Sequence, residues 1–209
     1  MKYATVFWDF NGTIVDDVQL GIHAVNRMLV KRGLVPIPDT DTYHRVFRFP
    51  VREYYRLLGF DFEKEPYEDL AVEWVENYTA EEQTLTVQKG FFTVWQHLKN
   101  AGIQQIILSS SETAMLRRQM DILGLAGRFD RVFGLDDIYA GGKVEMAKRC
   151  IGDTGGRALL IGDTTHDADT ARAIGADCIL YTGGHGAPSV LASCGVPTID
   201  QLTDILSYL

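Results

Sequence analysis

The chain opens with a short apolar run that stops on a charge. Residues 3–8 are rich in β-branched and aromatic side chains and end at Asp9, which is typical of a buried strand. Residues 16–32 then carry the spacing of an amphipathic helix, followed by Gly33, a residue that suits the end of a helix. The apolar positions of this predicted helix are Val18, Ile22, Val25 and Leu29.

No convincing strand is predicted between about residue 16 and residue 85. Pro50 and Pro66 stand where first-turn prolines would open two further helices. Residues 66–83 are acidic and amphipathic, and the apolar face of this segment consists of Leu70, Trp74 and Tyr78. The whole block is predicted to form a small helical bundle.

After residue 86, short apolar runs alternate with helical segments. Strands are predicted at 103–108, 131–133, 158–161 and 177–181, and helices at 91–100, 112–124, 143–150, 167–174 and 200–208. This alternation indicates a parallel sheet with crossover helices on both faces. We therefore expect an α/β, Rossmann-like core formed by residues 1–15 and 86–209, with residues 16–85 inserted as an α-helical cap domain.

Composition and charge narrow the classes of partner. The 209 residues are 46% apolar and 23% charged, with a formal net charge of −8. This charge argues against a binder of nucleic acid or of anionic membranes, which would need a basic patch. No apolar run approaches the ~20 residues that span a bilayer, no signal peptide is expected before the first strand, and the three cysteines show no C-x-x-C spacing. We expect a cytoplasmic protein that is a monomer or a weak homodimer.

Polar side chains follow several of the predicted strands. Asp9, Ser109 and Asp163 each stand at the end of a different strand, and Lys143 and Asp167 begin helices near the same edge. Taken singly, each could be a turn residue, a helix cap or a solvated side chain. Ligands of open α/β sheets bind beyond the carboxyl ends of the strands. We therefore expect these side chains to meet at one edge of the sheet.

Together these residue types suit phosphoryl transfer, which needs a nucleophile, neutralisation of phosphate charge and a metal. Asp9 would be a nucleophile that forms an acyl phosphate. Asp163 and Asp167 offer hard oxygen ligands for Mg²⁺. The Ser109 hydroxyl and the Ser110 amide could hold phosphate oxygens, while the lysine balances the carboxylates.

These motifs resemble those of the haloacid dehalogenase superfamily of phosphotransferases. DFNGT at 9–13 is similar to its first motif, D-x-D-x-T, IILS at 106–109 to its second, and Lys143 to the lysine of its third. LLIGDTTHD at 159–167 is similar to the acidic fourth motif. The helical insertion between the first two motifs resembles the cap of phosphoglycolate phosphatase-like and β-phosphoglucomutase-like members. GDTGGR at 152–157 has no apolar strand before it and is predicted to be a loop.

Asn11 departs from the first of these motifs. In phosphatases of the family the second carboxylate protonates the leaving oxygen and later activates water, and an amide can do neither. The backbone carbonyl, which the family uses as a metal ligand, is retained. The resemblance therefore implies a Mg²⁺ site made by Asp9, the Asn11 carbonyl, Asp163 and Asp167, with weakened proton transfer. Losing a general acid or base typically costs ~10²–10⁴ in rate, so Asn11→Asp is expected to help alkyl phosphates more than aryl or acyl phosphates.

The leading hypothesis is a Mg²⁺-dependent hydrolase of phosphoric monoesters that acts on a small phosphorylated metabolite. One alternative is a binding or regulatory protein with little turnover, which Asn11 would favour. Another is a phosphonatase or dehalogenase relative; a phosphonatase would need a Schiff-base lysine, and the lysines clearly inside the predicted cap are Lys31 and Lys64. A phosphoacceptor receiver domain would not need the ~70-residue insertion, which is far longer than ordinary connections.

Substrate choice is expected to lie in the cap. The stretch HRVFRFP at 44–50 places Arg45 and Arg48 before Pro50. These arginines could clamp a substrate carboxylate or a second phosphate. The alternative is a solvated basic turn.

Overall fold

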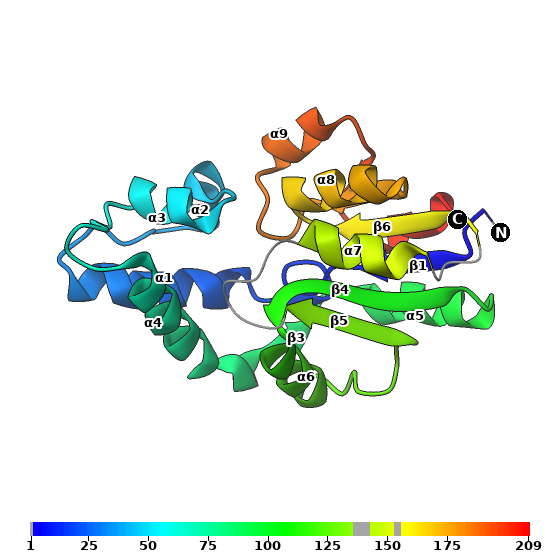
Figure 1. Ribbon diagram of the computed structural model, residues 1–209, viewed down its shortest axis with the longest axis horizontal. Coiled ribbons are helices and arrows are strands. Elements are labelled where there is room, and N and C mark those ends of the chain that lie inside the picture. Colours follow the sequence, from blue (N-terminus) through cyan, green and yellow to red (C-terminus); the bar gives the residue numbers. More distant parts are fainter. Residues whose placement is uncertain (1, 136–142, 153–155) are drawn as a thin grey trace.

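A six-stranded parallel sheet forms the centre of the molecule (Figure 1). The computed structural model, which describes residues 2–135, 143–152 and 156–209, places the strands in the order β5-β4-β1-β6-β7-β8. Their bounds are β1 Thr5–Trp8, β4 Gln104–Glu112, β5 Arg131–Leu135, β6 Ala158–Gly162, β7 Asp177–Tyr181 and β8 Thr198–Ile199. Every neighbouring pair is parallel, so the predicted α/β, Rossmann-like core is confirmed. The chain moves to one side of β1 first and later to the other, which makes the end of β1 a switch point where ligands bind.

Helices cover both faces of this sheet, as the alternation of the sequence predicts. They are α5 Phe91–Asn100, α6 Thr113–Ile122, α7 Lys143–Ile151, α8 Thr165–Ile174 and α9 Pro188–Leu191. Within β1, the side chains of Val6 and Trp8 belong to one hydrophobic cluster and Phe7 belongs to another, because successive strand residues point to opposite faces. The first cluster includes residues of α5 and α6, and the second includes residues of α7 and α8. No helix in the described part of the chain is both long and apolar enough to cross a membrane.

A group of helices lies to one side of the sheet, between β1 and β4 in the sequence (Figure 1). These helices, which we call the helical insert, are α1 Val18–Lys31, α2 Thr40–Val46, α3 Val51–Leu57, α4 Tyr67–Thr79 and the 3₁₀ turn Glu82–Thr84. They share a hydrophobic cluster of their own that includes Val25, Leu29 and Leu70. Arg32 ties the insert together by donating to Glu65 at 2.5 Å and to Glu73 at 2.6 Å.

Two short strands join the helical insert to the sheet. β2 (Val15–Asp16) and β3 (Thr86–Val87) pair antiparallel, at the two ends of the block 16–85 in which no strand is predicted. Two residues are too few to show an alternating pattern. The pairing also fixes where the chain enters and leaves the insert.

The C-terminal segment differs from the predicted helix at 200–208. It is a 3₁₀ helix, Leu202–Ser207, preceded by the short strand β8. Its buried apolar residues, Leu202 and Ile205, are three apart, and side chains at this spacing align on one face of a 3₁₀ helix. Residues 153–155 of the predicted loop at 152–157 lie outside the described residues.

Candidate active site

Asp9 lies at the carboxyl end of β1, an inner strand of the sheet. Its backbone amide donates to the Ile161 carbonyl at 2.8 Å, so pairing with β6 holds the residue as the chain leaves the sheet. Gly12 turns the chain with a φ of 76°, which glycine adopts without strain. A Cβ at this position would overlap the carboxylate of Asp163. The loop after β1 is therefore shaped to bring Asp9 and Asp163 together.

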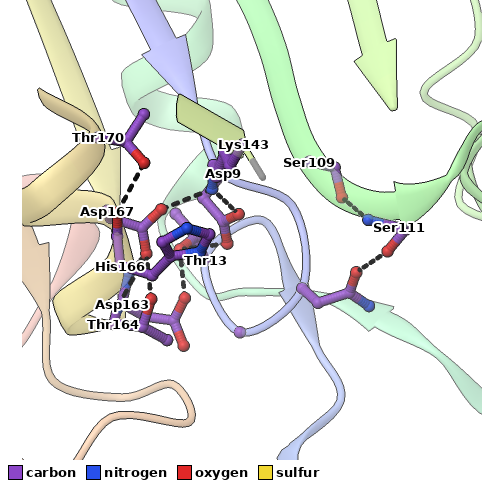
Figure 2. A network of polar contacts seen from close by, with 12 residues as sticks. Asp9, Thr13, Ser109, Ser111, Lys143, Asp163, Thr164, His166, Asp167 and Thr170 are labelled. Carbon is purple, nitrogen blue, oxygen red and sulfur yellow. Dashed lines mark hydrogen bonds and ion pairs between the residues drawn. The ribbon is translucent and has the colours of Figure 1, made fainter. Parts of the chain in front are cut away.

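A buried lysine joins two carboxylates of the site (Figure 2). Lys143 begins α7 and is 2% exposed. Its Nζ donates to Asp9 Oδ1 and, at 2.5 Å, to Asp167 Oδ1. Burial raises the pKa of Asp9 to about 6, against the opposing effect of the lysine. Burial also disfavours the charge of Lys143, but the two carboxylates outweigh it and raise the pKa of the ammonium group.

Asp163 and Asp167 follow β6 and are fixed by donors from several loops (Figure 2). Thr13 Oγ1 donates to Asp163 Oδ1 at 3.0 Å, and the backbone amide of His185 donates to Asp163 Oδ2 at 2.6 Å. Asp167 Oδ2 accepts from the amide and hydroxyl of Thr164 at 3.0 and 2.7 Å. This capping box begins α8, so helix formation itself orients the Asp167 carboxylate.

These carboxylates fit a divalent cation. One oxygen from each member of the acidic cluster lies within 4.8 Å of the others, and the members are Asp9, Asp163 and Asp167. Burial, together with the charge of Asp9, holds the pKa of Asp163 well above its usual range, against the opposing charge of His185. Around this site the described residues include a fourth buried carboxylate, Asp17, and two cationic side chains, Lys143 and His185. When all four carboxylates are ionised they outnumber these cations by two, and buried oxygen ligands with that charge suit a divalent cation.

Asn11 belongs to a second polar network beside Asp9. Its Nδ2 donates to Asp17 Oδ2 at 2.8 Å and to the Tyr78 hydroxyl at 3.1 Å. Its Oδ1 accepts from the Ser111 hydroxyl at 2.7 Å, and the Tyr78 hydroxyl donates to Asp17 Oδ2 at 2.7 Å. An aspartate at position 11 would place a second carboxylate against Asp17, which like charge disfavours. The amide therefore fits its surroundings.

An ion pair extends this network to the loop after β7. His185 Nε2 lies 3.1 Å from Asp17 Oδ1, and its Nδ1 lies 2.8 Å from the Tyr43 hydroxyl. Burial lowers the pKa of the imidazole, but Asp17 outweighs this effect and the pKa is raised to about 9. Tyr43 lies in α2 and Tyr78 in α4. The network thus connects the helical insert to the edge of the sheet.

Ser109 and Ser110 lie inside β4, which continues to Glu112 instead of ending at residue 108. The register between β4 and β5 shifts along this stretch, and Ser109 Oγ accepts from the Ser111 amide at 3.0 Å (Figure 2). Both serines line the same cavity as Asp9 and Lys143. The structure therefore brings together the residues that the motif order places at the phosphate.

A cavity of about 280 Å³ opens over the acidic cluster. Its floor is formed by strand-end and neighbouring residues, which include Asp9, Asn11, Ser109, Ser110, Lys143 and Asp163. Eight aromatic residues from the helical insert line it as well, and we call them the aromatic wall: Tyr43, Phe47, Phe49, Tyr54, Tyr55, Tyr67, Trp74 and Tyr78. Apolar walls around a few convergent polar groups are typical of small-molecule sites.

Arg45 and Arg48 do not line this cavity in the described structure. Arg45 donates to the Thr42 hydroxyl at 2.7 Å, and Arg48 donates to the carbonyls of Val46 and Arg45 at 3.3 and 3.1 Å. Both arginines line a neighbouring depression between the helical insert and the residues that begin α8 and α9. The depression shares three lining residues with the cavity, so the arginines lie beside the cavity but do not line it.

Two parts of the site were not predicted from the sequence. His185 follows β7 at the same sheet edge as Asp163, within GGHGAP at 183–188, so the strand-end rule could have identified it. The residues of the aromatic wall are scattered over 43–78. Their helices read only as amphipathic, because spacing shows that a helix has an apolar face and not what that face covers.

Comparison with known sequences identifies relatives. Residues 6–181 match the family described as haloacid dehalogenase-like hydrolase. A phosphoglycolate phosphatase from Caulobacter vibrioides is 27% identical over 190 residues, which cover 87% of this chain and 80% of that protein. The tyrosine-protein kinase PtkA of Mycobacterium tuberculosis is 24% identical over 212 residues, which cover 96% of this chain and 72% of PtkA.

Solved structures agree on the fold. The structure of M. tuberculosis PtkA superposes with a TM-score of 0.82 at 21% identity, covering 99% of this chain and 98% of that one. The haloacid dehalogenase-like protein SP0104 from Streptococcus pneumoniae gives 0.81 at 20% identity, with the same coverage of 99% and 98%. The family match spans most of the chain, and the matching motif residues lie together at one sheet edge. The chain therefore belongs to the haloacid dehalogenase-like hydrolases, and its relatives include phosphoglycolate phosphatases.

Proposed function

We propose that the protein is a Mg²⁺-dependent phosphatase that hydrolyses a small phosphorylated metabolite through an aspartyl-phosphate on Asp9. The observation that supports this most is the position of Asp9 on the cavity floor, paired with Lys143 and beside Asp163 and Asp167. A nucleophile, a fixed cation and metal-binding oxygens in one place are what phosphoryl transfer requires.

The residues that would hold the metal are Asp9, the backbone carbonyl of Asn11 and Asp163, with Asp167 bound directly or through water. When bound, Mg²⁺ supplies neutralisation of charge at the phosphate oxygens. The unbalanced charge of the site supports this assignment, because four buried carboxylates accompany two cationic side chains among the described residues of the region.

In the first step, Asp9 Oδ2 attacks phosphorus and the bond from phosphorus to the leaving oxygen breaks. Asp9 Oδ1 is held by Lys143, whereas Oδ2 accepts a long hydrogen bond of 3.3 Å from Thr13, so Oδ2 is the oxygen free to react. The lysine also favours the ionised carboxylate. The Ser109 hydroxyl and the Ser110 amide would donate to phosphate oxygens as charge moves onto them.

In the second step, water attacks the phosphorus of the aspartyl-phosphate. The bond from phosphorus to Asp9 Oδ2 breaks, which restores the carboxylate and releases phosphate that carries both protons of the water. The Asn11 amide neither takes the proton of this water nor gives one to the leaving oxygen, since its Nδ2 and Oδ1 are engaged by Asp17, Tyr78 and Ser111. Substrates whose leaving group needs a proton should therefore react ~10²–10⁴ more slowly than those that do not.

Hydrolysis of acetyl phosphate with and without Mg²⁺ tests this function, because its leaving group needs no protonation. Wild-type protein should hydrolyse it only with the metal, and Asp9→Asn should lose roughly 10³-fold or more in rate. Asp16→Asn is the matched control, since Asp16 is exposed and lies outside the cavity. Mass spectrometry after an acid quench should find phosphate on Asp9. Wild-type rates from Asp9→Asn would overturn the mechanism.

The two alternatives predict different outcomes. A phosphonatase would need a lysine free to form a Schiff base, but Lys31 pairs with Glu73 at 3.1 Å and Lys64 with Asp61 at 2.8 Å, and neither lines the cavity. A binding protein with little turnover would bind Mg²⁺ and phosphate yet leave acetyl phosphate intact.

A further inference from the structure

The composition of the cavity walls indicates the chemistry of the substrate. Resting on the proposed phosphatase function, we infer that the protein acts on an aryl phosphate monoester, whose aromatic ring lies against the aromatic wall while its phosphate lies at Asp9. Two independent observations support this substrate class. One is the chemistry of the wall, and the other is the amide at position 11.

The rings of the aromatic wall contact one another in two groups, and both groups line the cavity. Tyr43 and Phe47 stack with their centroids 5.0 Å apart, and Phe47 meets Tyr54 edge to face at 5.3 Å. Trp74 and Tyr78 stack at 4.9 Å on α4. An aromatic ring of a ligand can pack on these side chains in the same stacked or edge-to-face arrangements. An apolar cavity of about 150 Å³ suffices to bind benzene, so about 280 Å³ accommodates one ring together with a phosphate.

The cavity offers no spare cation for a second acidic group. No arginine occurs among the described residues that line it. Lys143 is paired with Asp9 and Asp167, and His185 is paired with Asp17. The remaining lining histidine, His166, packs against the ring of Phe49 at 5.3 Å. The sequence of residues 136–142 and 153–155, outside the described ranges, contains no lysine, arginine or histidine.

A substrate with a carboxylate or a second phosphate would therefore bury that charge against aromatic rings. Tyrosine hydroxyls of the wall can donate to such a group, but none carries the positive charge that balances a buried anion. An uncharged aromatic ring gains from the same surface. The wall thus discriminates against phosphoglycolate-like and bisphosphate substrates, and it favours a ring.

The amide at position 11 leads to the same substrate class through reactivity. Phenolic hydroxyls ionise near pH 10, so an aryl oxygen can leave as the anion, whereas an alkyl oxygen needs a proton from the enzyme. Asn11 cannot provide that proton, and its amide hydrogens are already donated to Asp17 and Tyr78. A phosphatase that handles aryl esters has no need of the missing acid.

Four probes, all assayed with Mg²⁺, separate ring recognition from leaving-group reactivity. Phenyl phosphate has a ring and a good leaving group, benzyl phosphate has a ring and an alkyl leaving oxygen, phosphoglycolate has a carboxylate and no ring, and acetyl phosphate reports the basic chemistry. We expect kcat/KM, which reports transfer of the phosphoryl group to Asp9, to be about 10²-fold higher for phenyl phosphate than for benzyl phosphate. For phosphoglycolate, kcat/KM should be about 10²-fold or more below that for phenyl phosphate.

A matched pair of variants tests the wall itself. Phe49 lines the cavity and is 40% exposed, whereas Phe92 is 43% exposed and lies outside it, so neither substitution should unfold the protein. Phe49→Ala should lower kcat/KM for phenyl phosphate about tenfold more than for acetyl phosphate. Phe92→Ala should change neither value.

Each outcome bears on one of the two claims. If no probe is hydrolysed, acetyl phosphate included, the proposed function itself fails. If acetyl phosphate is hydrolysed through Asp9 but phosphoglycolate equals or exceeds phenyl phosphate in kcat/KM, the phosphatase stands and the aryl substrate class is overturned. Equal kcat/KM for benzyl and phenyl phosphate would also overturn the argument from Asn11, because another group would then supply the proton to the leaving oxygen.

Discussion

The floor and the aromatic wall of the cavity are built on different physical principles. On the floor, buried charges stand within ion-pair distance, as between Lys143 and the carboxylates of Asp9 and Asp167, and loop donors fix the carboxylate of Asp163. On the wall, rings of the helical insert contact one another, as Phe47 and Tyr54 do. The floor therefore depends on individual ion pairs and hydrogen bonds, and loss of one partner is severe. The wall depends on summed apolar contact, so loss of one ring is graded.

The largest effect should come from removing the buried cation of the floor. Lys143→Gln leaves two carboxylates without their ion-pair partner, so the free energy of unfolding should fall by about 3–5 kcal/mol. Lys148→Gln is the control on the same helix, because its ion pair with Glu145 is exposed and such pairs contribute about 0–1 kcal/mol. Urea unfolding measures both. Similar small losses in the two variants would show that the floor does not depend on charge as described.

Added metal should stabilise the floor in turn. Mg²⁺ at about 100 times its dissociation constant should raise the free energy of unfolding by about 2.7 kcal/mol, because it binds the folded state alone. Asp163→Asn should remove most of this response, whereas Asp169→Asn, at an exposed position on α8, should retain it. A thermal shift with and without Mg²⁺ measures the response. Equal responses in the two variants would place the cation elsewhere.

A substitution at Asn11 tests the hydrogen bonds that this side chain makes beside the cavity floor. Asn11→Asp sets a carboxylate against Asp17 in place of a 2.8 Å hydrogen bond, so the free energy of unfolding should fall by about 1–3 kcal/mol. Adding Asp17→Asn restores a donor to the pair. A double-mutant cycle should therefore give a coupling of about 0.5–3 kcal/mol, and additive losses would contradict the hydrogen bond.

The smallest effect should come from the wall. Tyr54 is buried, and its hydroxyl has no hydrogen-bond partner among the described residues. Tyr54→Phe should therefore leave stability unchanged or raise it by about 1 kcal/mol. Tyr78→Phe is the contrasting variant. Its hydroxyl donates to Asp17 at 2.7 Å, and its loss should cost about 1–3 kcal/mol. Denaturant midpoints compare the two, and equal losses would remove the distinction.

Much of the fold follows from sequence periodicity. The helix predicted at 91–100 coincides with α5, and the strand at 158–161 falls within β6. The helix is long enough, and the strand apolar enough, for its type to be clear from the sequence pattern. The shift of Ser109 and Ser110 into β4 was not foreseen, because an irregular pairing with β5 extends that strand through three serines. Pairing between strands distant in sequence leaves no local pattern.

The position of the two arginines shows another limit of the sequence. The prediction opens the next helix at Pro50, whereas α2 already begins at Thr40. Asp39 is its N-cap and accepts from the Thr42 amide at 2.7 Å. Arg45 thereby falls in the last turn of α2. The capping aspartate is the sequence signal for the start of α2. It is easily missed, because the helix that follows is short and weakly apolar compared with the longer helices of the insert.

The ribbon of β2 and β3 has a consequence for the history of such proteins. Because Val15 pairs with Val87 and Asp16 with Thr86, the chain enters and leaves the helical insert at neighbouring points, about 4.7–4.9 Å apart across the ribbon. A gene segment encoding a different insert of any length could be exchanged there without altering the path of the sheet or the strand end that carries Asp9. The ribbon is thus a point at which a different insert can be joined to the same sheet. The catalytic strand end would be kept, while the helices that line the substrate cavity would be replaced.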